Sequence, residues 1–466
     1  MLRIFKHYIP TTIVILMLVE LVVLYSSVYA GAYLRFYDSE NIALNIELLQ
    51  PLHIKAGFFA LVMWLSMTAV GLHARNNVDD FAGMMIRIFI SFILGLAIIS
   101  LSYYIYPLVF LGRGVFAFAL LISFIAILIT RTFFQKLDNH RLFKRRLLVM
   151  GAGEKAKLLN DRVAYARKRG YEIVGFVDID QNEAQVDKDD LLEIQSTLLD
   201  LCLDNQIDEI VLAMDDRRKG FPLSGLLECK MKGIVVRDLL DSLERITGHI
   251  ELHALHPSAV IFSDGFTNAV SVSYAKRLFD IIASLLILTV TSPVIILTSA
   301  AIWLSSFGRD PVFYAQVRLG LCDAPFEVLK FRSMKTDAEK EGAQFAKKND
   351  SRVTAIGSFI RKTRIDELPQ LINVLKGDMS FIGPRPERPQ FVLAFEQSIP
   401  HYALRHTVKP GITGWAQICY PYGDTEEDTR NKLQYDLYYI KNYSLFLDMT
   451  ILFQTVQVVL FGQGAR

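Results

Sequence analysis

Residues between positions 309 and 417 combine arginines, lysines and a few carboxylates in short polar motifs. The guanidinium fork of arginine binds phosphate oxygens in a bidentate way, so these motifs favour a substrate that carries phosphate groups. The motifs are Gln316-Val-Arg318-Leu-Gly320, Lys330-Phe-Arg332-Ser-Met-Lys335-Thr-Asp337, Arg361-Lys-Thr-Arg364-Ile-Asp366-Glu367-Leu-Pro369-Gln370, Gly383-Pro384-Arg385-Pro386-Glu387-Arg388 and Lys409-Pro-Gly411-Ile-Thr-Gly414-Trp415-Ala-Gln417.

Within these motifs, Asp366-Glu367-Leu-Pro369 has the residue types of a helix start. Asp is a favoured N-cap, and proline is tolerated in a first turn, where its missing N–H is not needed. A carboxylate against unpaired N–H groups and the positive end of the helix dipole should stay ionised and could receive a phosphoryl group. Glu367 could hold Mg²⁺ together with Asp366. The plainer alternative is a capped, salt-bridged helix start, with Arg385 in a rigid proline-flanked turn.

A long apolar run at 278–304 precedes these motifs. Pro293 lies in its middle and predicts a kink, and Ser292 could bind a carbonyl that the proline leaves free. A kinked helix could enter one leaflet and return on the same side. The alternative is a fifth transmembrane helix, which would place all later residues on the other side of the membrane.

Four further apolar runs, at roughly 10–31, 54–74, 84–106 and 108–130, fill the first third of the chain, and each is near the ~20 residues that span a bilayer. Basic residues before the first run and after the fourth predict that both ends of this bundle lie in the cytoplasm. Glu20 is the main charged residue inside these runs. It is either a functional acid or a residue that faces a partner helix.

After Arg146, short β-rich runs alternate with polar, helix-forming stretches, which predicts a doubly wound parallel sheet. Its first turn, Gly151-Ala-Gly153-Glu-Lys-Ala156, is only a partial dinucleotide fingerprint, and Asp178 lies somewhat beyond the spacing of a ribose-binding acid. We therefore expect a spacer or regulatory domain rather than a bound dinucleotide. His249, His253 and His256 lack carboxylates at ligand spacing, so surface or interface histidines are favoured over a metal site.

Composition sets the class of protein. The chain has 466 residues, of which 52% are hydrophobic, and a mean hydropathy of +0.31. The 50 Lys+Arg nearly balance the 48 Asp+Glu, so nothing points to nucleic acid. Four cysteines with no CxxC spacing predict reduced, cytosolic surroundings without a disulfide or zinc site.

From about Ser273 to the C-terminus the chain resembles the bacterial sugar transferase family, the monotopic phosphoglycosyl transferases. The likeness lies in the Ser292-Pro293 break, Lys330-Phe-Arg332-Ser-Met, Arg361…Asp366-Glu367-Leu-Pro-Gln, Gly-Pro-Arg385-Pro-Glu and Lys409-Pro-Gly-Ile-Thr-Gly-Trp-Ala-Gln. The apolar N-terminal third and the predicted middle domain resemble the family's long members, which initiate exopolysaccharide synthesis.

The resemblance implies that Asp366 attacks the β-phosphate of a UDP-sugar, releases UMP and carries a phospho-sugar, which undecaprenyl or another polyprenyl phosphate then accepts. Glu367 would assist with Mg²⁺ or with proton handling. Phosphate- or substrate-binding roles would fall to Arg361, Arg385, Arg332, Lys330 and Lys409. A hexose such as glucose or galactose is the usual expectation, and a homodimer is implied by the resemblance alone.

Because nucleotide-sugars are cytosolic, the implied reaction favours the re-entrant form of 278–304 at the bacterial inner membrane. The predicted architecture is a mixed membrane protein. It comprises a four-helix transmembrane bundle at 1–135, a Rossmann-like α/β cytosolic domain at 146–265 and an α-rich catalytic domain at 273–466. The apolar C-terminal stretch fits either an amphipathic helix on the membrane or a helix packed in the core.

Two other classes of function are weaker. A non-catalytic scaffold or sensor for polysaccharide assembly predicts loss of the catalytic acids and arginines, and these are present. A sugar-modifying oxidoreductase would need a fuller glycine fingerprint and a Tyr-x-x-x-Lys pair, and none occurs between residues 147 and 265.

Overall fold

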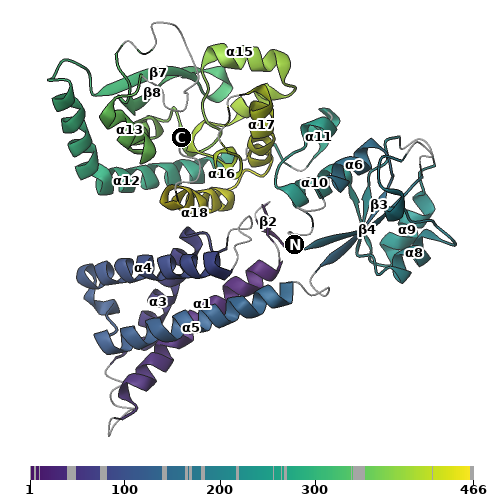
Figure 1. The fold of residues 1–466 in the computed structure, drawn as a ribbon, viewed down its shortest axis with the longest axis horizontal. Helices are drawn as coiled ribbons and strands as arrows, with labels where there is room; N and C mark the ends of the chain where they lie inside the picture. Colours follow the sequence, from purple (N-terminus) through teal and green to yellow (C-terminus); the bar gives the residue numbers. More distant parts are fainter. Residues whose placement is uncertain are drawn as a thin grey trace. The chain divides into compact units, whose positions relative to one another are not determined.

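A computed structural model of the chain (Figure 1) shows two compact units that divide between Thr247 and Gly248. The described residues are 2–4, 7–9, 11–38, 49–73, 81–138, 144–162, 166, 170–179, 184–216, 220–255, 257–263, 265–266, 270–336, 338, 352–421, 423 and 425–461.

Four long apolar helices form most of the N-terminal third, as the sequence predicts. Glycine permits close packing between the first and the last of them, since a Cβ at Gly31 would lie 2.8 Å from the backbone nitrogen of Ala119. Leu24, Phe59 and Ile88 lie in the buried core between the helices. The helices are α1 (Thr11–Phe36), α3 (Leu52–Ala69), α4 (Phe81–Ile105) and α5 (Arg113–Asp138), with the 3₁₀ turn η1 (Pro107–Val109) and the short strands β1 (Leu2–Ile4) and β2 (His7–Ile9).

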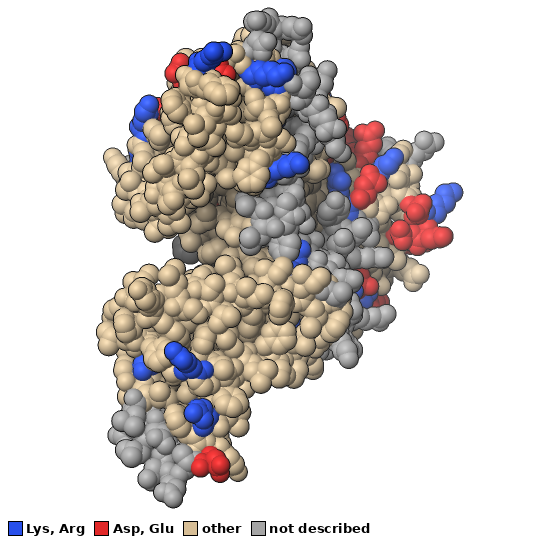
Figure 2. Space-filling view, turned by 60° about the vertical axis from the view of Figure 1, so that its left-hand side comes forward, with Lys and Arg blue, Asp and Glu red and all other residues tan. Residues whose placement is uncertain are grey.

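These four helices and a fifth at Ser273–Ser305 are long and apolar enough to cross a membrane by length and composition. The visible face of the bundle carries few charged side chains (Figure 2). Glu20 is fully buried and lies 2.7 Å from Nε of Arg131 and 2.7 Å from Nε2 of His73. The structure therefore shows Glu20 facing partner residues, the second of the two alternatives for this acid.

The middle of the chain contains the predicted parallel sheet, with strand order β4-β3-β5-β6. Alternate residues of β3 enter two separate cores. Leu147 packs with α6 and α10, and Leu148 packs with α8 and α9, so helices cover both faces. The strands are β3 (Arg145–Met150), β4 (Tyr171–Val177), β5 (Glu209–Leu212) and β6 (Val235–Asp238), and the helical elements are α6 (Glu154–Asn160), η3 (Lys188–Asp190), α8 (Leu198–Asp204), α9 (Leu223–Met231) and α10 (Leu239–Thr247).

The second unit holds the predicted catalytic region, built from helices and two small sheets. Strands β7 and β8 pair antiparallel, and β9 and β10 pair parallel. Its elements are η4 (Leu252–Ala254), α11 (Pro257–Phe262), α12 (Val270–Ser305), β7 (Phe313–Leu319), η5 (Leu321–Asp323), β8 (Pro325–Phe331), α13 (Ala355–Lys362), η6 (Ile365–Glu367), α14 (Gln370–Lys376), β9 (Ser380–Ile382), α15 (Pro389–Ser398), η7 (Tyr402–Thr407), β10 (Gly411–Thr413), α16 (Trp415–Cys419), α17 (Glu426–Lys441) and α18 (Leu445–Phe461).

Residues 248–255 pack with this second unit, although the sequence placed them in the middle domain. The Trp415 indole donates to the carbonyl of Gly248 at 2.9 Å, and the amide of Ile250 donates to the carbonyl of Gln434 at 3.1 Å. Leu252 and Leu255 are part of the same buried core as α17 and α18.

Helix α12 contains Pro293, and its two halves run in different directions (Figure 1). Proline cannot donate to the carbonyl four residues earlier, which belongs to Thr289. The hydroxyl of Ser292 donates to that carbonyl at 2.8 Å, which confirms the compensation predicted from the sequence.

The start of the C-terminal helix α18 packs in the core of the unit, which is one of the two arrangements expected for it from the sequence. Leu447 and Ile451 are fully buried, and Asp448 pairs with Lys276 of α12 at 2.7 Å. This buried pair joins α18 to the beginning of α12.

Candidate active site

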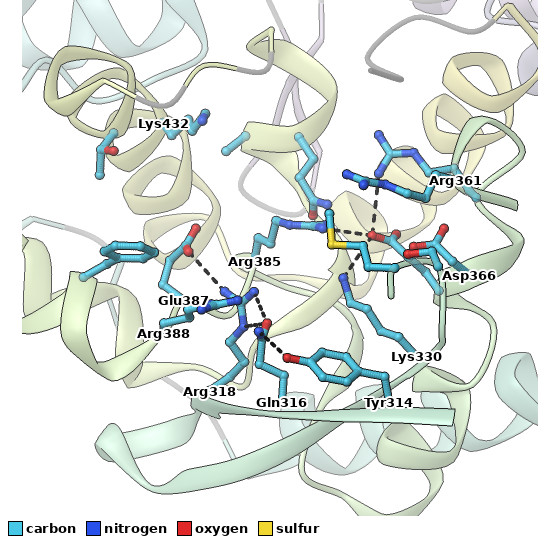
Figure 3. A pocket seen from close by; sticks show the side chains of 18 of the residues that line it. Tyr314, Gln316, Arg318, Lys330, Arg361, Asp366, Arg385, Glu387, Arg388 and Lys432 are labelled. Atoms are coloured by element: carbon cyan, nitrogen blue, oxygen red, sulfur yellow. Dashed lines mark hydrogen bonds and ion pairs between the residues drawn. The ribbon is translucent and has the colours of Figure 1, made fainter. Parts of the chain in front are cut away.

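A pocket of about 510 Å³ lies in the second unit and brings together residues from most of the predicted motifs. Strand β7 presents one polar face to it, because residues 314, 316 and 318 alternate along the strand. The remaining walls come mainly from β8 and the residues after it, α13, η6, the 385–388 loop, α15, η7, α16 and α17 (Figure 3). Functional side chains that line it include Tyr314, Gln316, Arg318, Lys330, Arg332, Arg361, Arg364, Asp366, Glu367, Arg385, Glu387, Arg388, Tyr402, Arg405, Lys432 and Asp436.

The Asp366–Glu367 pair sits in the 3₁₀ turn η6, between α13 and α14. Threonine 354 caps α13, where its hydroxyl accepts from the amide of Gly357 at 2.9 Å, and the last turn of that helix carries Arg361. Helix α14 is fixed to β8 by Asn373, whose amide donates to the carbonyl of Glu327 at 2.7 Å. These contacts hold the acidic turn in place from both sides.

The N-cap prediction for Asp366 is wrong. Asp366 lies inside the 3₁₀ turn, and the N-cap position belongs to Arg364, which adopts left-handed φ of 59° and makes no side-chain cap hydrogen bond. Such backbone conformations are uncommon for residues other than glycine and recur at functional sites.

The electrostatic surroundings of Asp366 differ from those expected, because burial rather than a helix N-terminus dominates the shift of its pKa. Its side chain is 9% exposed, and burial followed by the adjacent Glu367 charge raises its pKa to about 6, against the opposing effect of Lys330, Arg385 and Arg361. Burial therefore outweighs the nearby cations, yet the carboxylate remains largely ionised at neutral pH.

Glu367 experiences the opposite balance. Burial alone would raise its pKa, but Arg385, Lys330 and Arg364 together lower the pKa to about 2. Its Oε1 lies 2.9 Å from Nη2 of Arg385 and 3.7 Å from both Nζ of Lys330 and Nη1 of Arg364. Two neighbouring carboxylates thus have separated pKa values, a pattern typical of acid–base and nucleophilic sites.

The cations around the pair are also perturbed. Burial lowers the pKa of Lys330 to about 8, although Glu367 opposes the shift. In Figure 3, Lys330, Arg385 and Arg361 lie around Asp366. Together these groups form a cationic ring that suits the oxygens of a diphosphate.

Four predicted residues have other contacts or lie outside the pocket lining. Arg332 lines the pocket, but its Nε donates to the carbonyl of Pro311 at 2.9 Å. Lys409 does not line the pocket, and its pKa is lowered by burial and by Arg277 of α12. Ser292 and Pro293 lie within α12 and serve its bend.

Sequence reasoning missed the buried pair of Arg405 and Asp436. Their Nη2 and Oδ2 atoms are 3.1 Å apart, and Arg405 also donates to the carbonyl of Arg385 at 2.9 Å and to the hydroxyl of Tyr402 at 2.5 Å. Arg405 therefore positions the segment that carries Arg385. The sequence offered one sign of this pair: Asp436 is a carboxylate within the otherwise mostly apolar and aromatic stretch around Tyr438, where a buried partner is expected.

The partial glycine fingerprint of the middle domain faces an internal carboxylate. Asp215 accepts from the amides of Glu154 and Lys155 at 2.9 and 3.0 Å, at the start of α6. A Cβ at Gly153 would lie 1.9 Å from Oδ2 of Asp215, so glycine is required for this close approach. Asp215 thus takes the amides that a dinucleotide phosphate would use.

The other residues singled out from the sequence have ordinary surroundings. Nε2 of His249 lies 3.3 Å from Glu251, His253 is exposed, and His256 lies outside the described residues. Cys202 and Cys229, distant in sequence, meet with sulfurs 4.0 Å apart inside the middle domain, and both are free.

Residues 271–462 match the bacterial sugar transferase family. An Aeromonas hydrophila UDP-N-acetylgalactosamine-undecaprenyl-phosphate N-acetylgalactosaminephosphotransferase is 44% identical over 241 residues, 52% of this chain and 56% of that protein. A Caulobacter vibrioides UDP-glucose:undecaprenyl-phosphate glucose-1-phosphate transferase is 37% identical over 49% of this chain and 85% of that protein. A Salmonella typhimurium undecaprenyl-phosphate galactose phosphotransferase is 29% identical over 72% of this chain and 74% of that protein.

The chain therefore belongs to the bacterial sugar transferase family. It spans only about half the length of the Aeromonas protein, at 56%.

Proposed function

We propose that this protein transfers a hexose-1-phosphate from a UDP-sugar to undecaprenyl phosphate, releases UMP and so initiates exopolysaccharide synthesis. The observation that carries the proposal is the buried, ionisable Asp366 beside Glu367 in a pocket lined by Arg361, Arg385 and Lys330. The names of the relatives, which describe sugar-phosphate transfer to undecaprenyl phosphate, support the same reaction class.

In the first step, a carboxylate oxygen of Asp366 attacks the β-phosphorus of the donor. The bond from that phosphorus to the bridging oxygen breaks, and UMP leaves with the electron pair. In the second step, a phosphate oxygen of the acceptor attacks the same phosphorus, which breaks the bond to Asp366 and gives polyprenyl diphosphate sugar. A pKa of about 6 leaves Asp366 about 90% ionised at pH 7, as a nucleophile requires.

The cations in the pocket have separate tasks in this scheme. Arg385 holds Glu367 at 2.9 Å and, with Arg361, faces the space in which the diphosphate would lie. Lys330 adds a positive charge beside both carboxylates. As negative charge shifts from the attacked phosphoryl group to the leaving UMP, these fixed charges stabilise it without reorganisation.

Mg²⁺ fits the donor set in kind, because carboxylate oxygens are the ligands it prefers. Asp366 and Glu367 would hold it together with the phosphates of the donor, although Oε1 of Glu367 already lies near three cationic groups. When bound, the ion would neutralise charge on the diphosphate.

We further propose that α12 enters the membrane and returns on the same side. Its 36 residues would rise about 54 Å if straight, well beyond a hydrocarbon core of about 30 Å. Near its start, Arg277 donates to the carbonyl of Leu375 at 2.7 Å, and near its end Ile302 packs with Phe331 and Ile360. Because both ends contact the same unit, a re-entrant helix at the cytoplasmic face of the inner membrane fits better than a fifth span.

The parallel sheet is assigned as a Rossmann-like cytosolic domain that acts as a spacer or regulatory element. The occupation of its first-turn amides by Asp215 supports this assignment over dinucleotide-dependent chemistry.

The test is UMP release by purified protein in nanodiscs with Mg²⁺ and undecaprenyl phosphate. Donors would be UDP-glucose, UDP-galactose and UDP-N-acetylgalactosamine. We expect turnover of one donor, dependence on Mg²⁺ that EDTA abolishes, and loss in Asp366→Asn. Asp310→Asn, an acid that does not line the pocket, is the matched control.

A second readout addresses the covalent step. With a donor labelled in the sugar and no acceptor, label should stay on the wild-type chain, be released by hydroxylamine as expected of an acyl phosphate, and be absent from Asp366→Asn. Full activity of Asp366→Asn would refute the role of Asp366 as the nucleophile. If no UDP-sugar is turned over, a non-catalytic scaffold becomes the favoured function.

A further inference from the structure

Three potential metal ligands converge at a place outside the pocket lining. Asp323 lies in the turn between β7 and β8, Glu396 lies on α15, and His406 lies on η7. One ligand atom from each lies within 4.8 Å of the other two. Among the described residues, this is the one group of at least three His, Cys, Asp or Glu side chains with such spacing.

His406 supplies an independent observation. The residue is only 7% exposed, and its Nδ1 forms an ion pair with Oδ1 of Asp323 at 2.5 Å. A buried imidazole nitrogen and a carboxylate oxygen, two of the three potential ligands, are thus already in direct contact.

The turn that presents Asp323 is unusual for its sequence. Cys322 and Asp323 both have positive φ, at 53° and 60°, and the amide of Ala324 donates to the carbonyl of Leu321 at 3.2 Å. Turns whose two central residues both have positive φ are dominated by Gly, Asn and Asp, so Cys322 is the unusual residue here. Here the turn directs an acidic side chain toward η7, where His406 lies.

We propose that Asp323, Glu396 and His406 bind one divalent transition-metal cation of the zinc class, at a site separate from the proposed Mg²⁺ position. An imidazole with two carboxylates matches the mixed nitrogen and oxygen ligands of Zn²⁺, whereas Mg²⁺ favours oxygen ligands alone. The cation would take the place between Nδ1 of His406 and the two carboxylates, with solvent completing its coordination.

The position of the site suggests a bracing role. Two of the three elements also line the pocket, α15 with Phe391 and η7 with Arg405, and η5 directly follows β7, which contributes Arg318. A cation that joins them would favour the folded arrangement of this wall by mass action, since the unfolded chain has no such site.

The test uses the full chain, from which the affinity tag has been removed. The protein is first treated with a chelator and is then kept in excess Mg²⁺, so that sites with oxygen ligands alone are filled. Zn²⁺ binding is measured by equilibrium dialysis with elemental analysis. We expect one equivalent per chain. Asp323→Asn and Glu396→Gln should each lower the affinity for Zn²⁺ by about 10- to 100-fold or more, because loss of even a group that supports a ligand costs that much. Glu426→Gln, a similarly exposed acid on α17, is the matched control and should bind as the wild type does.

Co²⁺ provides a second measurement that reports on the imidazole. Its visible absorption should show a nitrogen-containing site in the wild type and lose that signature in His406→Ala. His406 is buried, and replacing it could unfold the protein. The decisive comparison is therefore between the wild type and the two variants of exposed acids, Asp323→Asn and Glu396→Gln. Equal Zn²⁺ affinity in wild type, Asp323→Asn and Glu396→Gln, or no Zn²⁺ binding by the wild type, would overturn the proposal.

Discussion

The perturbed groups of the pocket predict a bell-shaped dependence of kcat/KM on pH. Asp366 must be ionised to attack phosphorus, so activity should fall as the pH drops through its pKa of about 6. Lys330 stabilises phosphate charge only when protonated, so activity should fall as the pH rises through its pKa of about 8. Lys330→Arg separates the two effects, because arginine stays charged at every pH of the assay.

The magnitude follows from these values. At pH 7 both groups are about 90% in the active form, so about four-fifths of the protein is competent, and at pH 5 or pH 9 one group falls to about 10%. Activity should therefore drop about ninefold two pH units from the optimum. In Lys330→Arg, activity at pH 9 relative to pH 7 should be about tenfold higher than in the wild type, with the acid limb still near pH 6.

The assay is UMP release at subsaturating donor across this pH range, with each variant normalised to its own value at pH 7. Lys362→Arg, an exposed lysine on α13 outside the pocket lining, is the control and should keep the alkaline limb. In Lys330→Met, loss of a charge that lowers the pKa of Asp366 should move the acid limb to higher pH. An alkaline limb that persists unchanged in Lys330→Arg would refute the role given to Lys330.

Two further predictions concern α12. Lys276→Met removes the cationic partner of the buried Asp448, at 2.7 Å, and leaves it the hydroxyl of Tyr439 at 2.8 Å. Thermal unfolding should therefore show a loss of about 3–5 kcal/mol, much of it recovered in the double variant with Asp448→Leu. Equal losses in the single and double variants would contradict this account. Cys322 is exposed and follows α12, so a membrane-impermeant maleimide should label it in inside-out but not right-side-out vesicles, with Cys322→Ser as the control. Labelling from the outer side would instead support a fifth span.

Much of the fold could be predicted from the sequence because its signals are local. The lengths of the apolar runs, the break at Pro293 and the β-rich runs after Arg146 each depend on a short stretch of chain. The structure has apolar helices and a parallel sheet in those places, with bounds shifted by a few residues. The packing of residues 248–255 with the second unit could not be predicted, because it depends on Trp415 and Gln434, far along the chain.

The sequence by itself determined the chemistry of the candidate site: two adjacent acids, Asp366 and Glu367, among arginines and lysines suited to phosphate. Residue types and short spacings contain that information. Only the tertiary structure decided which residues meet, since it placed Arg405 behind Arg385 and left Lys409 outside the pocket. It also decided that burial raises the pKa of Asp366, because desolvation and charge–charge distances depend on the whole surrounding fold rather than on neighbours in the chain.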